Sequence, residues 1–271
     1  MEDVMIATDK IEAAKERFGQ LLEEQLRRVE EMKAQGDFID YKSLDQIIIG
    51  VCGGDGIGPA ITAQAQRVLE YLLKDEVNSG KVAFRVIDGL TIERRAAENA
   101  AIPPAVLEEL KQCHVILKGP TTTPRKGDPW PNVESANVAM RKELDLFANV
   151  RPVRIPEQGI DWTFFRENTE GAYAVGSKGI NVTEDLGVDF TVVTTQGTER
   201  IIRAAFEFAK ANGKTRVTAV TKANIIKTTD GKFLDIFREI AKEYPDITAD
   251  DWYIDIMTAK LVDEREEKTS K

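Results

Sequence analysis

The sequence is poor in cysteine and histidine, which narrows the chemistry open to it. Among its 271 residues there are two cysteines, Cys52 and Cys113, and one histidine, His114. Two cysteines cannot build a disulfide scaffold or a cysteine-rich zinc site, so we expect a reducing, cytoplasmic location. One histidine excludes a metal centre with several imidazole ligands. A Ser-His-Asp hydrolase would depend on a residue that adjoins an apolar strand.

Long apolar runs and basic blocks are missing as well. No stretch approaches the roughly 18 consecutive apolar residues that cross a bilayer, and residues 1–10 lack the apolar core of a signal peptide. We therefore expect no membrane association. The net charge of −9 without a basic cluster argues against nucleic acid as a partner. A hydrophobic fraction of 42% over 271 residues is ordinary for one large globular domain or two smaller ones.

Strand and helix patterns alternate along the chain and predict an α/β fold with right-handed crossovers. A charged amphipathic helix over about 8–35 comes first, and its apolar stripe favours packing on the same chain over a contact between subunits. Residues 47–51 are a wholly apolar, β-branched run typical of a buried parallel strand. Periodicity further predicts strands at 82–88, 114–118, 147–153, 163–166, 189–195 and 216–220, and helices at 59–75, 103–111, 137–146, 198–213 (capped by Thr198) and 230–244.

A glycine-rich turn, residues 53–59, joins the first predicted strand to the helix that follows it. Backbone amides at the start of a helix can hold a phosphate. The glycine spacing, however, is neither that of a dinucleotide fingerprint nor that of a P-loop. A structural turn is the favoured interpretation, and close approach of a substrate or cofactor to this turn stays open.

Cationic and hydroxyl side chains gather near the ends of predicted strands. Arginine forks bind carboxylates through two hydrogen bonds, so several of them aimed at one point suit a di- or tricarboxylate; scattered surface arginines are an equally good explanation. Tyr173 is either a structural hydroxyl or a proton donor. Lys222 follows a strand, at the sheet edge where open α/β folds bind ligands. The gathered residues are Lys118, Thr122, Thr123, Ser135, Asn137, Arg141, Arg151 and Arg166.

Six segments together resemble the isocitrate/isopropylmalate dehydrogenase family in order and approximate spacing. They are 54–59 (GDGIGP), 118–124 (KGPTTTP), 137–146 (NVAMRKELDL), 149–154 (NVRPVR), 165–170 (FRENTE) and 222–227 (KANIIK). The resemblance extends over about 46–261. It implies NAD or NADP as cofactor, Mg²⁺ or Mn²⁺, oxidative decarboxylation of a 2-hydroxy acid, and a homodimer whose active site is shared between subunits.

The resemblance also points to the substrate. Ser135 and Asn137 match the Ser-x-Asn of isocitrate dehydrogenases, which binds a carboxylate where isopropylmalate dehydrogenases carry apolar residues. Isocitrate, converted to 2-oxoglutarate and CO₂, is therefore the predicted substrate. Isopropylmalate, homoisocitrate and a non-catalytic regulatory subunit are the alternatives. Residues 125–134 depart from the glycine-rich loop usual in the family.

Individual residues take their expected roles from the same resemblance. Tyr173 matches the tyrosine that protonates the enolate left when CO₂ departs. Lys222 matches the lysine that helps to deprotonate the 2-hydroxyl, and Asp255 matches a metal-binding aspartate that the family supplies, with this lysine, from the neighbouring subunit. The further matches are Arg141, Arg151 and Arg166 to the substrate carboxylates, and Lys118, Thr123 and Asn224 to the cofactor side of the site.

The family's three-layer fold implies a division of the chain into a helical extension (1–44), the N-terminal part of a large domain (45–146) and a small dimerising domain (147–271) with a clasp at about 171–190. After Asp255 the family continues to two more metal aspartates and an adenosine-binding loop, which these 271 residues do not contain. We therefore expect a fragment that is inactive by itself, with a degenerate chain as the alternative. The choice between NAD and NADP stays open.

Overall fold

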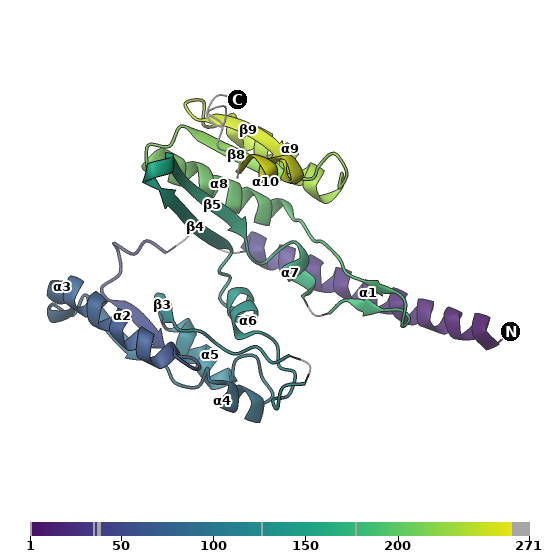
Figure 1. Ribbon diagram of the computed structural model, residues 1–271, viewed down its shortest axis with the longest axis horizontal. Helices are drawn as coiled ribbons and strands as arrows, with labels where there is room; N and C mark the ends of the chain where they lie inside the picture. Colours follow the sequence, from purple (N-terminus) through teal and green to yellow (C-terminus); the bar gives the residue numbers. More distant parts are fainter. Residues whose placement is uncertain (1, 35, 37–38, 126, 177, 262–271) are drawn as a thin grey trace. The chain divides into compact units, whose positions relative to one another are not determined.

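The computed structural model describes residues 2–34, 36, 39–125, 127–176 and 178–261, with the side chains described from residue 8 onward. The chain divides into two compact units (Figure 1). One unit is continuous, Gly36–Leu146; the other combines Met1–Gln35 with Phe147–Lys271. No helix in the described part of the chain is long and apolar enough to span a membrane.

The unit of residues 36–146 is built on a three-stranded parallel sheet. The apolar run becomes the central strand β1 (Ile47–Cys52), which pairs with β2 (Val82–Val86) on one side and β3 (Val115–Lys118) on the other. Its helices are α2 (Gly58–Leu72), α3 (Lys74–Asn78), α4 (Ile92–Ala97), α5 (Pro104–Lys111) and α6 (Ala136–Glu143). The core joins sheet to helices through Cys52, Ile87, Leu90, Val106 and Leu110.

The other unit joins an antiparallel hairpin to a parallel strand pair. Strands β4 (Ala148–Ile155) and β5 (Ile160–Glu167) form the hairpin, with the 3-10 turn η1 (Pro156–Gln158) between them. Strands β8 (Arg216–Thr221) and β9 (Thr248–Tyr253) run parallel. Helix α8 (Thr195–Ala211) packs on β5, β8 and α9 (Thr229–Ala241), and Figure 1 shows it beside the hairpin. The smaller elements are α7 (Ala172–Val175), β6 (Ile180–Asn181), β7 (Gly187–Val188) and α10 (Ile254–Leu261).

An aromatic core holds these elements together. Phe206 of α8 is fully buried, and its ring lies 4.7 Å from that of Tyr244 and 5.7 Å from that of Phe237. Such pairs add to the free energy of burial because the rings stack or meet at an offset. Phe165 of the hairpin packs against the same core, which fixes β5 and the turn that follows it.

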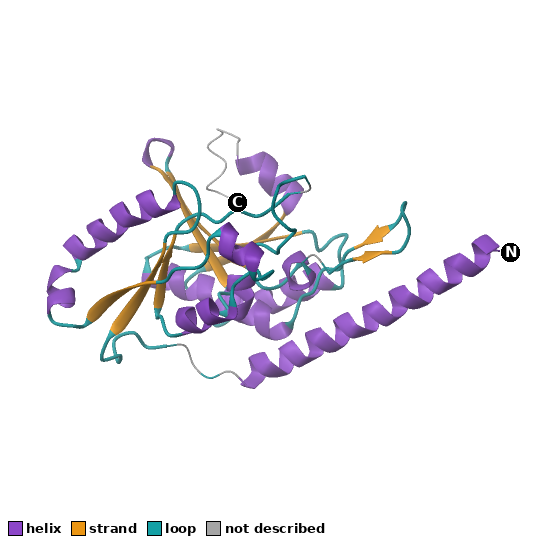
Figure 2. Cartoon of the chain, turned by 90° about the horizontal axis from the view of Figure 1, so that it is seen from below, coloured by secondary structure: helices purple, strands orange, loops and turns teal. Residues whose placement is uncertain are grey.

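Helix α1 (Glu2–Ala34) belongs to this second unit by its contacts. Leu21 is buried, the rings of Phe18 and Phe190 stack at 5.0 Å, and Lys178 pairs with Glu24 at 3.2 Å. Figure 2 shows α1 as one unbroken helix on the side of the β6–β7 hairpin. The prediction that its apolar stripe packs on the same chain is thus confirmed for Phe18 and Leu21, whereas Ile11 and Leu22 of the same stripe are exposed.

Two predictions of secondary structure were wrong. Residues 189–195 do not form a strand; they make one isolated bridge, between Val192 and Gly171. The helix that follows is capped by Thr194, whose hydroxyl accepts a hydrogen bond from the Gly197 amide, and not by Thr198, which lies buried inside the helix. A threonine in the extended conformation directly before the first turn satisfies an amide that the helix leaves without a partner, and Thr194 stands at that point.

Candidate functional site

The glycine-rich turn between β1 and α2 serves close backbone packing. A Cβ at Gly54, where φ is +72°, would lie 2.0 Å from the carbonyl oxygen of Pro120, and one at Gly58 would lie 2.2 Å from that of Gly53. Only glycine lets these segments of the backbone approach each other so closely. The close packing therefore supports the interpretation of residues 53–59 as a structural turn.

Asp55 in this turn anchors the segment that follows β3. Its carboxylate accepts hydrogen bonds from the backbone amides of Ile92, at 2.8 Å, and Thr122, at 2.6 Å. The carbonyl of the same Thr122 accepts from Arg95, so both backbone groups of this residue are held. Thr123, one of the predicted site residues, comes next in the chain.

Arg95 of α4 holds both ends of the segment 122–134. Its side chain is fully buried and donates to the carbonyls of Ala101 at 2.8 Å, Thr122 at 2.7 Å and Glu134 at 2.7 Å. Burial lowers the pKa of the Arg95 guanidinium, and the charge of Asp55 opposes that shift. The sequence analysis missed Arg95 because an arginine on a short helix carries no signal that separates a buried one from a surface one.

Replacing Arg95 by methionine should destabilise this unit strongly. The variant leaves three carbonyl oxygens without their guanidinium donor, and we expect the free energy of unfolding to fall by about 2–4 kcal/mol. Arg94→Met is the matched control: Arg94 is exposed and pairs with Glu98 across one helical turn, an interaction worth less than about 1 kcal/mol. Urea denaturation measures both. Equal losses in the two variants would contradict the role given to Arg95.

The predicted site residues of this unit line the ends of β3 and α6. Lys118 ends β3, and its ammonium donates to the Gly119 carbonyl at 2.9 Å and the Thr121 hydroxyl at 3.0 Å. Burial lowers the pKa of Lys118, and Arg141 of α6 acts in the same direction. Ser135 is the N-cap residue of α6, but its side chain makes no capping hydrogen bond within the described chain, so its hydroxyl is not used there. Thr123 and Asn137 are exposed.

The hairpin of the second unit presents Arg151 and Arg166 on one face. Arg166 pairs with Asn149, and Arg151 lies two residues beyond Asn149 on the same strand, so both arginines share a face of the pleated sheet. Arg151 donates to Asn149 at 2.8 Å, and Arg166 donates to Asn168 at 3.0 Å. Both side chains are exposed, so a ligand with a carboxylate group can reach both guanidinium forks.

Tyr173 lies in α7, beside Arg166. The Arg166 guanidinium carbon is 5.2 Å from the centre of the Tyr173 ring, a cation–π geometry. The tyrosine is 37% exposed, so the interpretation of Tyr173 as a fully buried structural hydroxyl does not hold. The structure therefore brings a guanidinium group and a phenol together at one end of β5.

Lys222 and Asp255 meet at the carboxyl ends of the parallel strands β8 and β9. Thr221 and Tyr253 are paired in register as the last residues of these strands, so the residues that follow them emerge at the same edge. The Lys222 ammonium lies 2.7 Å from Asp255 Oδ1, and this hydrogen bond lowers the pKa of Asp255. The backbone amide of Lys222 is fixed by Asp230 at 2.6 Å. Asn224 is exposed in the turn that follows.

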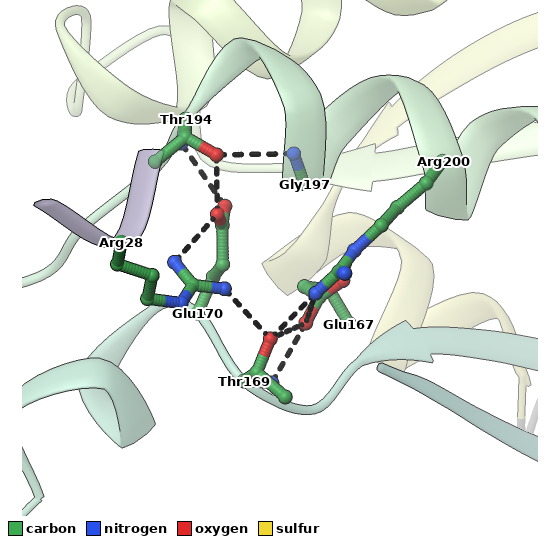
Figure 3. A network of polar contacts seen from close by, with 7 residues as sticks. All are labelled: Arg28, Glu167, Thr169, Glu170, Thr194, Gly197 and Arg200. Atoms are coloured by element: carbon green, nitrogen blue, oxygen red, sulfur yellow. Dashed lines mark hydrogen bonds and ion pairs between the residues drawn. The ribbon is translucent and has the colours of Figure 1, made fainter. Parts of the chain in front are cut away.

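A polar network supports the turn between β5 and α7 (Figure 3). Glu167, the last residue of β5, accepts from Arg200 Nε at 3.2 Å and from the hydroxyl of Thr169 at 2.5 Å. Arg200 also donates to the Thr169 hydroxyl at 2.8 Å. The motif FRENTE contains Glu167 and Thr169, yet sequence alone gave no sign that α8 would supply the cation.

A divalent metal would find one hard oxygen ligand at Asp255. Carboxylates suit Mg²⁺ and Mn²⁺, and Asp255 is exposed enough to be reached. Within the described ranges no three His, Cys, Asp or Glu side chains gather in a way that could hold a metal ion. Among the described residues, Asp255 would therefore fit a divalent metal as a single carboxylate ligand.

The comparisons with known proteins all find members of one family. A family model described as isocitrate/isopropylmalate dehydrogenase matches residues 48–269. Homoisocitrate dehydrogenase of Methanocaldococcus jannaschii is 34% identical over 228 residues, 78% of this chain and 62% of that protein. Regulatory subunit 1 of the mitochondrial NAD isocitrate dehydrogenase of Arabidopsis thaliana is 38% identical over 217 residues, 77% of this chain and 54% of that protein.

Solved structures resemble this chain in both sequence and fold. The crystal structure of isocitrate dehydrogenase from Methylococcus capsulatus has a TM-score of 0.66 and 35% sequence identity to this chain, and the match covers 80% of this chain and 63% of that one. The chain therefore spans between about half and two thirds of the length of these relatives.

Proposed function

Because the chain belongs to the isocitrate/isopropylmalate dehydrogenase family, we propose that it forms part of an NAD- or NADP-dependent isocitrate dehydrogenase. The observation that carries the proposal is the 2.7 Å contact between Lys222 and Asp255 at the ends of two parallel strands. A regulatory subunit without turnover is the second candidate, since one relative has that name. Tyr173 and Lys222 favour catalysis, because a chain that only binds substrate needs neither.

In the proposed reaction the chain's own groups bind the substrate and move two protons. Arg141, Arg151 and Arg166 bind the carboxylates. Lys222, in its neutral amine form, would take up the proton of the 2-hydroxyl as hydride leaves for the nicotinamide. Lys118, Thr123 and Asn224 would form the nicotinamide side of the site. Tyr173 donates a proton to the carbon that has lost CO₂. Bound Mg²⁺ or Mn²⁺ would supply polarisation of the substrate oxygens, with Asp255 as its ligand in this chain.

Formation of NAD(P)H tests the proposal. The assay follows absorbance of the reduced nicotinamide with isocitrate and Mn²⁺, on the protein together with any segment that follows Lys271 in its reading frame.

We further propose a homodimer in which Lys222 and Asp255 of one subunit complete the site of the other. Inactive Lys222→Met and Tyr173→Phe variants should then regain activity when their subunits are mixed.

We also propose a cytoplasmic location. Cys52 and Cys113 are both free thiols, which is typical of proteins in a reducing compartment.

Isocitrate should bind more tightly than 3-isopropylmalate. Ser135, whose hydroxyl does not cap α6 in the described chain, and Asn137 can donate to a third carboxylate, whereas an isopropyl group would leave both without a partner. A buried polar group without a partner costs about 1–3 kcal/mol, or roughly a factor of 5–150 in affinity. Calorimetry with Mg²⁺ measures both ligands, and a Ser135→Ala variant should narrow the difference. Equal or tighter binding of isopropylmalate would contradict the choice of substrate.

The 271-residue chain alone should not turn over isocitrate. Its described residues offer a divalent metal one carboxylate, Asp255, and a site with so few hard oxygen ligands holds the ion weakly. Absorbance of NAD(P)H with isocitrate and Mn²⁺ on the purified chain decides the matter. Robust activity would show that further metal ligands exist.

A further inference from the structure

The Arg28 side chain of helix α1 reaches the turn that precedes Tyr173 (Figure 3). Its guanidinium lies 3.1 Å from Glu170 Oε1 and donates to the Thr169 hydroxyl at 2.8 Å. Glu170 is 142 residues away in the sequence. The contact therefore joins the N-terminal helix to the motif that contains Arg166 and ends just before α7.

Glu170 is a buried carboxylate, 4% exposed, and a buried charge is costly unless it is paired and hydrogen-bonded. It accepts hydrogen bonds from the Thr194 amide at 3.0 Å and from the Thr194 hydroxyl. A Cβ at Gly197 would lie 2.2 Å from Glu170 Oε1, so the carboxylate rests against the first turn of α8. Arg28 is the cation that pairs with it in the described chain.

The two arginines share one hydroxyl. Thr169 Oγ1 accepts from Arg28 and from Arg200, each at 2.8 Å, and donates to Glu167 at 2.5 Å. Arg28 thus holds one end of the turn 167–170 and Arg200 holds the other. Because the Glu170 carbonyl accepts the Tyr173 amide at 3.3 Å and Gly171 pairs with Val192, the position of Glu170 sets where α7 begins.

We propose that Arg28 is a positioning residue for Tyr173: the N-terminal helix supplies the counter-ion that fixes Glu170, and Glu170 fixes the start of α7. This inference rests on the proposed role of Tyr173 as proton donor. Neither the sequence pattern nor the resemblance assigns any part of the site to α1.

The test reads the environment of Tyr173 directly. Uniform 3-fluorotyrosine labelling gives one ¹⁹F signal for each of the five tyrosines, and Tyr173→Phe identifies the one that belongs to Tyr173. In Arg28→Gln that signal should shift or broaden while the other four stay in place. Arg27→Gln, the exposed neighbour on the same helix, is the matched control and should leave all five unchanged.

Hydrogen exchange provides a second measure on the same variants. In Arg28→Gln the Thr194 amide, which donates to Glu170, should exchange at least tenfold faster, whereas amides of β1 in the other unit should be unaffected. Arg28→Lys keeps the charge but lacks the fork that spans Glu170 and Thr169. It should therefore give an intermediate shift of the Tyr173 signal, and it serves as the deciding variant if Arg28→Gln does not fold.

A Tyr173 signal unchanged in a folded Arg28→Gln or Arg28→Lys chain, with only the stability lowered, would overturn the proposal. Neither measurement uses substrate. Failure of isocitrate to bind would count against the proposed function and leave this result intact, so the two failures are distinguishable.

Discussion

Tyr173→Phe should lower the rate of oxidative decarboxylation by about 10²–10⁴-fold, the usual contribution of a general acid. The substitution removes one hydroxyl and keeps the ring that lies against Arg166. Substrate binding should therefore stay within about tenfold of the wild type, because the cation–π contact is kept and Arg151 and Arg166 are unchanged. The loss should fall on kcat, not on KM.

Steady-state kinetics on the protein with any segment following Lys271 measures this effect. Tyr71→Phe is the control, since Tyr71 is 80% exposed on α2 and should leave kcat unchanged. If the phenol acts only after CO₂ has left, reduction of added oxalosuccinate should be lowered less than the complete reaction. An unchanged kcat in Tyr173→Phe would remove Tyr173 from the mechanism.

Lys222→Met should cost about 10²–10⁴ in turnover as well, but on an earlier step. The methionine side chain is one atom shorter, keeps the flexible apolar stem and lacks the amine that is proposed to exchange a proton with the 2-hydroxyl. Oxalosuccinate reduction should therefore fall together with the complete reaction, in contrast to Tyr173→Phe. Lys227→Met, an exposed lysine in the same turn, is the matched control. Equal loss of both half-reactions in the Tyr173 and Lys222 variants would show that the two roles are wrongly assigned.

The same substitution also changes how Asp255 titrates. The hydrogen bond from Lys222 lowers the pKa of Asp255; without it, the carboxylate takes up a proton at a higher pH. Metal-dependent binding of isocitrate should then begin to weaken at a higher pH in Lys222→Met than in the wild type, as the pH is lowered. Calorimetry across the acidic range gives this curve for both proteins.

The sequence predicts a helix or strand well where the residues of that element alone show how it is buried. Residues 47–51 read as a buried parallel strand, and β1 is that strand with both neighbours parallel. Strand β9, which the sequence analysis missed, reads TADDWY; its carboxylates at 250 and 251 bind Thr218 and Arg238. This polar segment is a strand because its backbone pairs with β8, and its carboxylates find partners 32 and 13 residues away. No local pattern contains that information.

For the candidate site, too, the sequence predicts the residues whose place follows from local pattern and misses the others. Lys222 could be placed at a ligand-binding edge because it directly follows an apolar strand, and Asp255 meets it there through the register of β8 with β9. Arg95 and Arg28 could not be foreseen. Each is a charged helical residue of the kind that normally faces water, and each acquires its role from backbone or carboxylate groups contributed by segments distant in the chain.

The pairing of Arg28 with Glu170 has a consequence during synthesis. Arg28 of α1 leaves the ribosome before Glu170, the carboxylate that it neutralises, which lies 142 residues later; at about 5–20 residues per second the delay is roughly 7–28 s. The continuous unit, 36–146, is complete within that interval. Phe190, whose ring stacks on Phe18 of α1, is made later still, so we expect the apolar stripe of this helix to need chaperone protection during that interval.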